Sequence, residues 1–185
     1  LPVQSGSDRI LKAMNRPYRR DRYMQLVRDL RAVQPDMYFS TDIIVGFPGE
    51  TDEDFQMTCE MFEEIGFDMA FIFKYSPRSG TPAAEMDDDV PKTVKEDRNQ
   101  ILLKKLAIQS SRRNASLVGT TQEILVEGPA RKGEGMFMGR PRGFRKVIFP
   151  ASQRLVGEMV DVEIEESSVT TLKGRLSLVG VDTGM

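Results

Sequence analysis

Histidine is absent from this 185-residue sequence, and cysteine occurs once, at Cys59. Within these residues, the two shortages exclude a disulfide framework, a cysteine–histidine zinc site and acid–base catalysis by histidine. No apolar run approaches the roughly 20 residues that a membrane-spanning helix needs, and no signal peptide is visible. From these absences we expect a cytoplasmic protein with no membrane partner.

The residues that are present are typical of a folded protein. Apolar residues make up 39% of the sequence and charged residues 29%, which argues against disorder throughout. The length is sufficient for one domain and a small second one. The chain begins at Leu1, inside a predicted strand and without an initiator methionine, so we expect it to be part of a longer polypeptide.

Charge is strongly segregated along the chain, although its net value is only −2. Residues 46–97 contain 14 acidic and 4 basic residues, whereas residues 98–117 contain 5 basic and no acidic ones. Residues 131–146 contain one acidic and 6 basic residues, the basic ones being Arg131, Lys132, Arg140, Arg142, Arg145 and Lys146. A local excess of this kind is either the footprint of a polyanion-binding face or a solvated surface.

The first half alternates between helix and strand. Periodicity and capping residues predict helices at 8–14, 21–33 and 51–65 and strands at 39–45 and 69–75. The helix at 21–33 has an apolar stripe at Tyr23, Leu26, Val27, Leu30 and Val33. Thr51 and Asp54 form a capping box for the next helix, and Gly66 ends it. The near-continuous apolar strand at 39–45 is typical of a parallel sheet buried on both faces, so these elements predict an α/β fold.

The second half changes from a helical period to a strand period. An acidic linker at 83–90 precedes a predicted helix at 91–116, whose apolar stripe is Val94, Ile101, Leu102, Leu106 and Ile108. Five short strands follow, at 121–127, 136–139, 145–149, 159–164 and 172–178. Such a set is typical of a small β-barrel that binds oligonucleotides. We therefore expect two domains, at 1–116 and 117–181.

Three apolar segments end in polar turns that contain glycine or proline. They are Leu1-Pro-Val-Gln-Ser-Gly-Ser7, Asp42-Ile-Ile-Val-Gly-Phe-Pro-Gly-Glu-Thr51 and Phe71-Ile-Phe-Lys-Tyr-Ser-Pro-Arg-Ser-Gly-Thr-Pro82. Ligands of α/β proteins bind at the carboxyl edge of parallel strands, so three such edges predict one ligand-binding rim. Gly46 and Gly49 are needed for their turn whether or not a ligand is present. Cys59 lies among apolar helix positions and is expected to be a core thiol.

Together these motifs resemble those of radical S-adenosylmethionine (SAM) enzymes. The first half is similar to the C-terminal half of a radical-SAM barrel, and the whole chain resembles the C-terminal portion of the MiaB family of tRNA methylthiotransferases. Residues 117–181 resemble the TRAM module, a small, OB-like RNA-binding barrel. The resemblance implies an α/β fold, with the C-terminal half of a partial (β/α)6 radical-SAM barrel followed by a five-stranded β-barrel.

The resemblance also implies a SAM site at Gln4, Arg16, Asp42, Ile44, Gly46, Gly49, Phe73 and Ser76. Arg16 suits the methionine carboxylate, because a guanidinium forms a two-pronged pair with a carboxylate. Gln4 and Asp42 suit the ribose hydroxyls, while Ile44, Phe73 and Ser76 suit the adenine. Each role has a competing explanation. Arg16 could belong to a basic surface cluster, and Asp42 could cap a neighbouring element. Ile44 and Phe73 would be core residues in any α/β fold.

The similarity to TRAM implies an RNA site at Arg131, Lys132, Arg140, Arg142, Phe144, Arg145 and Lys146. Cations for phosphates and an aromatic ring for base stacking are what single-stranded or loop RNA requires. Family members usually have Gly-Arg-Thr-x-x-Asn-Arg here, whereas this chain has Pro141 for the threonine and Phe144 for the asparagine. Phe144 is therefore either a stacking residue or a packed loop residue.

The activity implied by the resemblance is the addition of a methylthio group to C2 of an N6-prenylated (isopentenyl) adenosine next to the anticodon. Its cofactors are SAM and two [4Fe–4S] clusters, which cysteines outside this chain would hold, with a reductant for the cluster. The implied partner is the anticodon stem-loop of tRNA, and the full-length protein is expected to be a monomer. Within this chain we expect no catalytic and no metal-binding residue, so that the chain alone is inactive.

Two alternatives remain open. One is a related methylthiotransferase that acts on threonylcarbamoyl-adenosine in tRNA or on a ribosomal protein, although Phe73-Lys-Tyr-Ser-Pro-Arg78 favours the prenyl-adenosine branch over the ribosomal-protein branch. The other is a non-catalytic RNA-binding module that keeps half a barrel as a scaffold. Two cysteine triplets upstream of Leu1 would identify an enzyme. Half a barrel also leaves strand edges unpaired, so we expect domain swapping or aggregation.

Overall fold

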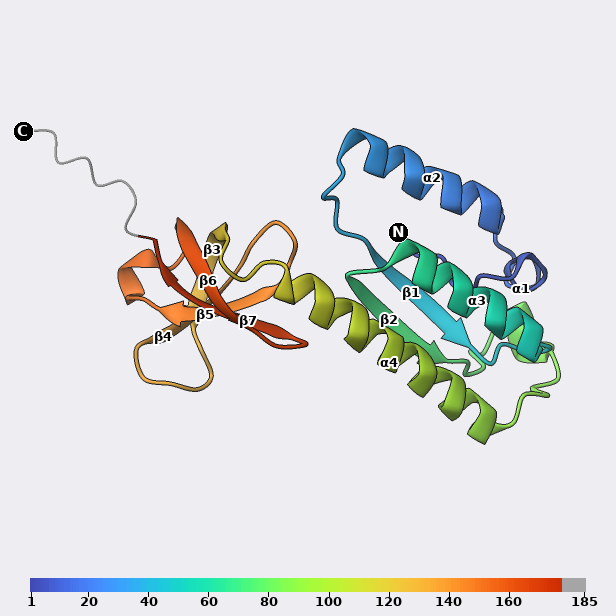
Figure 1. Ribbon diagram of the computed structural model, residues 1–185. Helices are drawn as coiled ribbons and strands as arrows, with labels where there is room; N and C mark the ends of the chain where they lie inside the picture. Colours follow the sequence, from blue (N-terminus) through green and yellow to red (C-terminus); the bar gives the residue numbers. More distant parts are fainter. Residues whose placement is uncertain (178–185) are drawn as a thin grey trace, which may run out of the picture. The chain divides into compact units, whose positions relative to one another are not determined.

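The computed structural model describes residues 1–177 (Figure 1). The chain forms two compact units, Leu1–Gln109 and the part from Ser110 onward. The units divide inside the long helix, and the domain boundary expected between 116 and 117 stays a prediction. The expected domain end at 181 and Leu178 of the last predicted strand lie outside the described residues. Over residues 1–177, the helices are all too short or too polar to cross a membrane.

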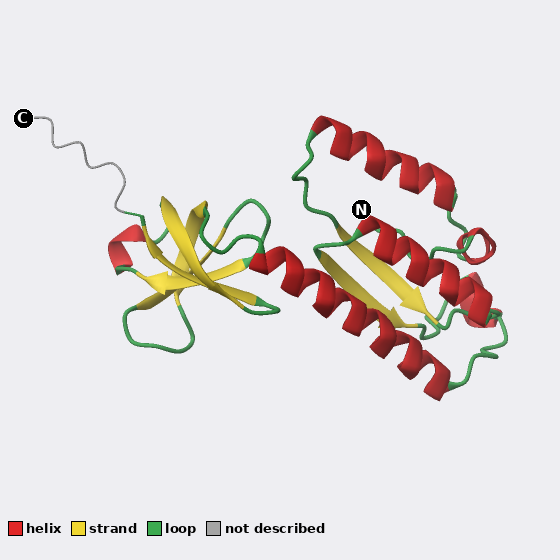
Figure 2. Cartoon of the chain, viewed as in Figure 1, coloured by secondary structure: helices red, strands yellow, loops and turns green. Residues whose placement is uncertain are grey.

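The first unit is an α/β layer with two parallel strands (Figure 2). Its elements are α1 (Asp8–Ala13), α2 (Arg20–Val33), β1 (Ser40–Val45), α3 (Asp52–Ile65), β2 (Met69–Lys74), the 3₁₀ turn η1 (Pro82–Glu85) and the part of α4 (Lys92–Ala115) up to Gln109. In the strand pair, Asp42 lies opposite Phe71 and Ile44 lies opposite Phe73. Gln4 adds one parallel bridge to Ile43. The α/β prediction is confirmed, and η1 occupies part of the segment expected to be a linker.

The two faces of this sheet differ in burial. Ile43, Val45 and Ala70 are buried in a core that α2, α3 and α4 complete. Because side chains alternate along a strand, Asp42 and Ile44 lie on the opposite face, as do the two phenylalanines paired with them. Phe71 and Phe73 are each 54% exposed. Burial of the strand at 39–45 on both faces was the wrong expectation for the described residues, because the helices pack on one face only.

The predicted helix ends are confirmed in α3. The Thr51 hydroxyl accepts from the Asp54 amide, and the Asp54 carboxylate accepts from the Thr51 amide, so the capping box is complete. Gly66 ends the helix with a left-handed φ of 62°. Cys59 is buried in the core, as expected. Local capping chemistry therefore determines where this helix begins and ends.

The predicted apolar stripes are partly wrong. In α2 the buried residues are Tyr23, Met24 and Val27, whereas Val33 is 86% exposed at the last turn. In α4 Leu102 is buried as expected, but Ile101 and Ile108 of the predicted stripe are exposed. The buried positions of α4 near its start are instead the cations Lys95 and Arg98, because acidic groups on neighbouring segments pair with both.

The second unit is a closed five-stranded barrel. Its elements are β3 (Thr121–Pro129), β4 (Met136–Arg140), β5 (Lys146–Pro150), the 3₁₀ turn η2 (Gln153–Leu155), β6 (Met159–Ser167) and β7 (Thr171–Leu176). The strand order is β3-β4-β5-β7-β6, and β5 pairs with β7 in parallel. Val147, Phe149 and Leu172 are fully buried in its core. The predicted small β-barrel is confirmed.

Candidate functional site

Six of the eight residues predicted for the cofactor site border one cavity in the first unit. The cavity has a volume of about 760 Å³, and the six are Gln4, Arg16, Asp42, Ile44, Phe73 and Ser76. They come from the N-terminal segment, the residues after α1, strand β1 and the end of β2. Gly46 and Gly49 lie in the turn that follows β1, outside the lining. The contacts of these residues with a ligand stay a prediction. Such contacts require that the residues share one cavity, and these six do.

Two residues at this cavity hold a left-handed backbone without being glycine. Gln4 has a φ of 69° and Asn15 a φ of 56°. Such a conformation costs of order 1 kcal/mol and persists where the surroundings fix it. The Gln4 amide donates to the Asp42 carbonyl at 2.9 Å, and the Gln4 carbonyl accepts from the Ile44 amide at 3.0 Å. Strand β1 therefore holds Gln4 in place at the cavity wall.

Asn15 is a cavity residue that sequence reasoning missed. It follows the short helix α1, and its amide donates to the Lys12 carbonyl at 3.0 Å. Asparagine tolerates the left-handed region better than most residues, so an asparagine just after a helix was the available signal. Its turn directs the chain into Arg16, whose amide donates to the Leu11 carbonyl at 2.8 Å.

Positive charge collects at the cavity. The guanidinium of Arg16 is exposed and, within residues 1–177, makes no hydrogen bond or ion pair. Lys74 and Arg78 also border the cavity, and the Lys74 ammonium lies 3.3 Å from the Glu96 carboxylate. A guanidinium that lacks a partner among the described residues is suited to bind an anionic group of a ligand.

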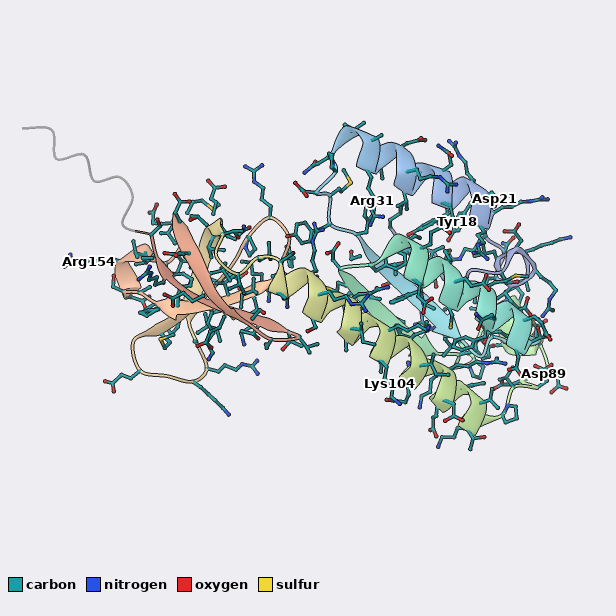
Figure 3. All side chains as sticks on the ribbon, viewed as in Figure 1. Tyr18, Asp21, Arg31, Asp89, Lys104 and Arg154 are labelled. Carbon is teal, nitrogen blue, oxygen red and sulfur yellow. The ribbon has the colours of Figure 1, made fainter. Side chains whose placement is uncertain are left out.

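The glycine turn after β1 is held by buried charges. The Gly46 amide donates to the Glu50 carboxylate at 2.6 Å, and Arg98 donates to the same carboxylate at 2.8 Å. The side chains of Arg98 and Glu50 are only 6% and 1% exposed. Asp89, labelled in Figure 3, accepts from the Gly49 amide at 2.7 Å. These contacts position the turn without any ligand, and sequence reasoning missed Glu50 and Arg98.

A second network joins the start of α1 to the start of α3 through Asp54. Its carboxylate accepts from the Ser7 hydroxyl at 2.5 Å, from the Thr51 amide at 2.9 Å and from Arg9. Burial alone would raise the pKa of Asp54, but these donors lower that pKa to about 2. Asp54 is therefore ionised at neutral pH and holds the helix that leads into Asn15 and the cavity.

Tyr75 positions the far wall of the cavity. Its amide donates to the Val45 carbonyl at 2.8 Å, and its hydroxyl donates to the Ala83 carbonyl at 2.6 Å. Its ring contacts Phe47 edge-on at 5.2 Å, and the Lys95 ammonium lies 5.1 Å from its centroid. Because Tyr75, Phe47 and Ala83 all border the cavity, this hydroxyl closes the loop between β2 and η1 beside it. Sequence reasoning quoted Tyr75 within a motif but gave it no role.

The residues predicted to bind RNA are divided between two loops of the barrel. Arg131 and Lys132 lie in the loop before β4, whereas Arg142 and Arg145 lie in the loop after it. Arg140 and Lys146 are the strand residues that flank the second loop. The two groups therefore occupy opposite ends of β4, about 17 Å apart for a strand of this length. The extended strand β4 separates the two groups, and their contacts with RNA stay a prediction.

Phe144 lies at the tip of the second loop. It has a φ of 62° and is 63% exposed. The Arg140 guanidinium lies 5.1 Å from the ring centroid and donates to the Phe144 carbonyl at 3.2 Å. Of the two roles predicted for Phe144, the packed loop residue is disfavoured by this exposure.

Comparison with known proteins finds a family match in each half of the chain. Residues 1–62 match the radical SAM superfamily, and residues 115–177 match the TRAM domain. The chain is 60% identical over 181 residues to the tRNA-2-methylthio-N(6)-dimethylallyladenosine synthase of Opitutus terrae, covering 98% of this chain and 38% of that relative. The proteins of the same name from Akkermansia muciniphila and Legionella pneumophila (strain Corby) are 49% and 48% identical, over 94% and 95% of the chain.

The chain is much shorter than these relatives, since it spans 38% of the second and 39% of the third. In the part of the chain that the structure describes, no three His, Cys, Asp or Glu side chains are placed to hold a metal ion together.

Proposed function

Because this chain belongs to the MiaB family of tRNA methylthiotransferases, we propose that its first unit supplies one side of a SAM site and that its TRAM barrel binds tRNA. The full-length enzyme adds a methylthio group to C2 of N6-prenylated adenosine next to the anticodon. The names of the relatives support this substrate. The observation that carries the proposal is the convergence of four separate chain segments on one cavity.

The chemistry of the lining supports SAM as the ligand. A methionine carboxylate needs a cation, and the Arg16 guanidinium is available for a two-pronged pair. Ribose hydroxyls need acceptors and donors, which Asp42 and Gln4 provide. The exposed ring of Phe73 and the side chain of Ile44 offer adenine an apolar surface. The residues present therefore fit the group that the family implies.

The residues of this chain bind and orient rather than react. Arg16 holds the methionine carboxylate of SAM and Asp42 its ribose, and the loop held by Tyr75 excludes water from one side of the ligand. When bound, SAM supplies the radical and methyl chemistry together with two [4Fe–4S] clusters and a reductant. We assign both clusters to residues outside this chain, because Cys59 is its one cysteine and is buried in the core.

The proposal extends to the partner and the setting. The TRAM barrel binds the anticodon stem-loop of tRNA through Arg140, Arg142, Phe144, Arg145 and Lys146, with Arg131 and Lys132 as a separate contact. The full-length enzyme acts as a monomer in the cytoplasm. The domain division is at 116/117, so that all five barrel strands belong to the RNA-binding part.

The test is the affinity for SAM of the full-length protein that contains this chain, measured by calorimetry. Arg16→Ala should weaken binding about 10- to 100-fold, since a charge-assisted hydrogen bond contributes about 1.5–3 kcal/mol. Arg22→Ala is the matched control: Arg22 is also exposed but does not border the cavity. Equal affinities for the two variants would remove Arg16 from the site.

A further inference from the structure

We propose that Phe144 and Arg140 form a stacking site for one unpaired base of RNA at the loop between β4 and β5. The inference rests on the RNA-binding role proposed for the barrel. It goes further in specifying the RNA that the loop takes, which is a single strand or a loop rather than a duplex.

Neither backbone geometry nor packing accounts for a phenyl ring at this position. A φ of 62° is favourable for glycine and tolerated by asparagine, whereas a bulky residue there is an outlier. The amide of Phe144 donates to the Pro141 carbonyl at 2.9 Å, a turn contact that many residue types could make. Phe144 is 63% exposed and is not among the buried residues of the barrel core. The remaining explanation for the ring is a contact outside the chain.

The surroundings of the ring indicate what that contact is. Arg140 is fixed from two sides, by its hydrogen bond to the Phe144 carbonyl and by a 3.0 Å ion pair with Glu127. It therefore holds its guanidinium 5.1 Å from the ring centroid, where it covers one face of the phenyl group. Much of the ring remains exposed, and a planar base can stack on the uncovered face.

The charge beside the ring favours a nucleic acid over a protein partner. Arg142 is 93% exposed on the same loop, and its contact with Glu123 is long, at 3.7 Å. A cation placed two residues from an aromatic side chain can neutralise the phosphate next to a stacked base. The bases of a duplex are already stacked on one another, so the ring can accept a base from an unpaired segment.

The absence of tryptophan from the chain allows a direct measurement. In Phe144→Trp the new side chain is the one tryptophan of the 185-residue chain, and a base that stacks on it quenches its fluorescence. The probes are an oligoribonucleotide with the sequence of an anticodon loop and the same strand annealed to its complement. We expect quenching by the single strand and little change with the duplex.

Affinity measured by fluorescence anisotropy at several salt concentrations separates stacking from charge. Phe144→Asn keeps a residue that tolerates the left-handed backbone, and it should weaken single-strand binding about 10-fold with an unchanged salt slope. Phe144→Tyr should restore the affinity. Arg142→Ala should instead lower the salt slope by about one.

The outcomes distinguish this inference from the proposed function. If Phe144→Asn binds the single strand as tightly as the parent chain while Arg142→Ala does not, the stacking site is wrong and RNA binding by the barrel stands. Equal quenching of Phe144→Trp by the duplex would overturn the preference for an unpaired base. If the parent chain binds neither probe, both proposals fail.

Discussion

Gly46 is a residue at which a single methyl group would meet two obstacles. Its φ of 69° strains any side chain, and an added Cβ would lie 2.3 Å from Cγ of Lys95. Lys95 is buried and paired with Asp88, so it cannot easily move aside. We expect Gly46→Ala to lower the free energy of unfolding by about 2–4 kcal/mol, from backbone strain and overpacking together.

Gly66→Ala is the matched control for this prediction. Gly66 has nearly the same φ, 62°, but an added Cβ would have no heavy atom within 4 Å. Its substitution should cost only the backbone strain, about 1 kcal/mol. Urea denaturation of both variants measures the difference, and equal losses would show that Lys95 yields to the methyl group.

At the scale of elements, Asp54 is the group that ties α1 to α3. Its pKa in the folded protein is about 2, below the ordinary value of 3.8. A carboxylate whose pKa is lowered by folding stabilises the folded state when the pH is above its pKa in the unfolded chain. This contribution is lost as the pH falls from about 4 through 2. The shift corresponds to about 2 kcal/mol of stability at neutral pH.

Asp54→Asn should therefore lose about 2 kcal/mol at pH 7 and show a flatter decline of stability below pH 4 than the parent protein. Glu53→Gln serves as the control, since Glu53 lies in the same helical turn but is exposed. Denaturation curves collected across this pH range decide the matter. If the free energy of unfolding of Asp54→Asn and of the parent protein fell equally steeply below pH 4, Asp54 would not link folding to pH.

The elements also show what the sequence could and could not predict. Strand and helix positions followed from periodicity, and Thr51, Asp54 and Gly66 located the ends of α3 because capping is local chemistry. The inward face of α4 was predicted only in part. Leu102 is buried as expected, but Lys95 and Arg98 are buried as well, because acidic partners outside the helix pair with them. Sequence spacing alone does not reveal such partners.

The candidate site was predictable to a similar extent. The motif glycines and prolines indicated a rim, and six of the expected residues do share a cavity. Asn15 and Tyr75 were missed because their roles depend on a left-handed turn and on a hydrogen bond across a loop. The basic residues were grouped by their proximity in sequence, although strand β4 places them at its two ends.

At the scale of the whole molecule, the two units differ in how completely they bury their apolar surface. The barrel is closed and has its own core. We expect residues 110–185, produced alone, to unfold in one cooperative transition by circular dichroism and to bind the single-stranded probe. Residues 1–109 alone, with Phe71 and Phe73 exposed on one sheet face, should bind a hydrophobic dye strongly. A gradual unfolding transition of residues 110–185, or no dye binding by residues 1–109, would contradict this contrast.

The order of strands in the barrel affects how it is made during translation. Among residues 1–177, β7 is the last strand in sequence, yet it inserts between β5 and β6 and pairs with a free edge of each. On the ribosome, the barrel cannot close until the last residue of β7, Leu176, has emerged from the exit tunnel. A truncated mRNA that ends a few codons before that point would give a protein with an open barrel, whose apolar interior is in contact with solvent. Such a protein would be a substrate for chaperones and proteases.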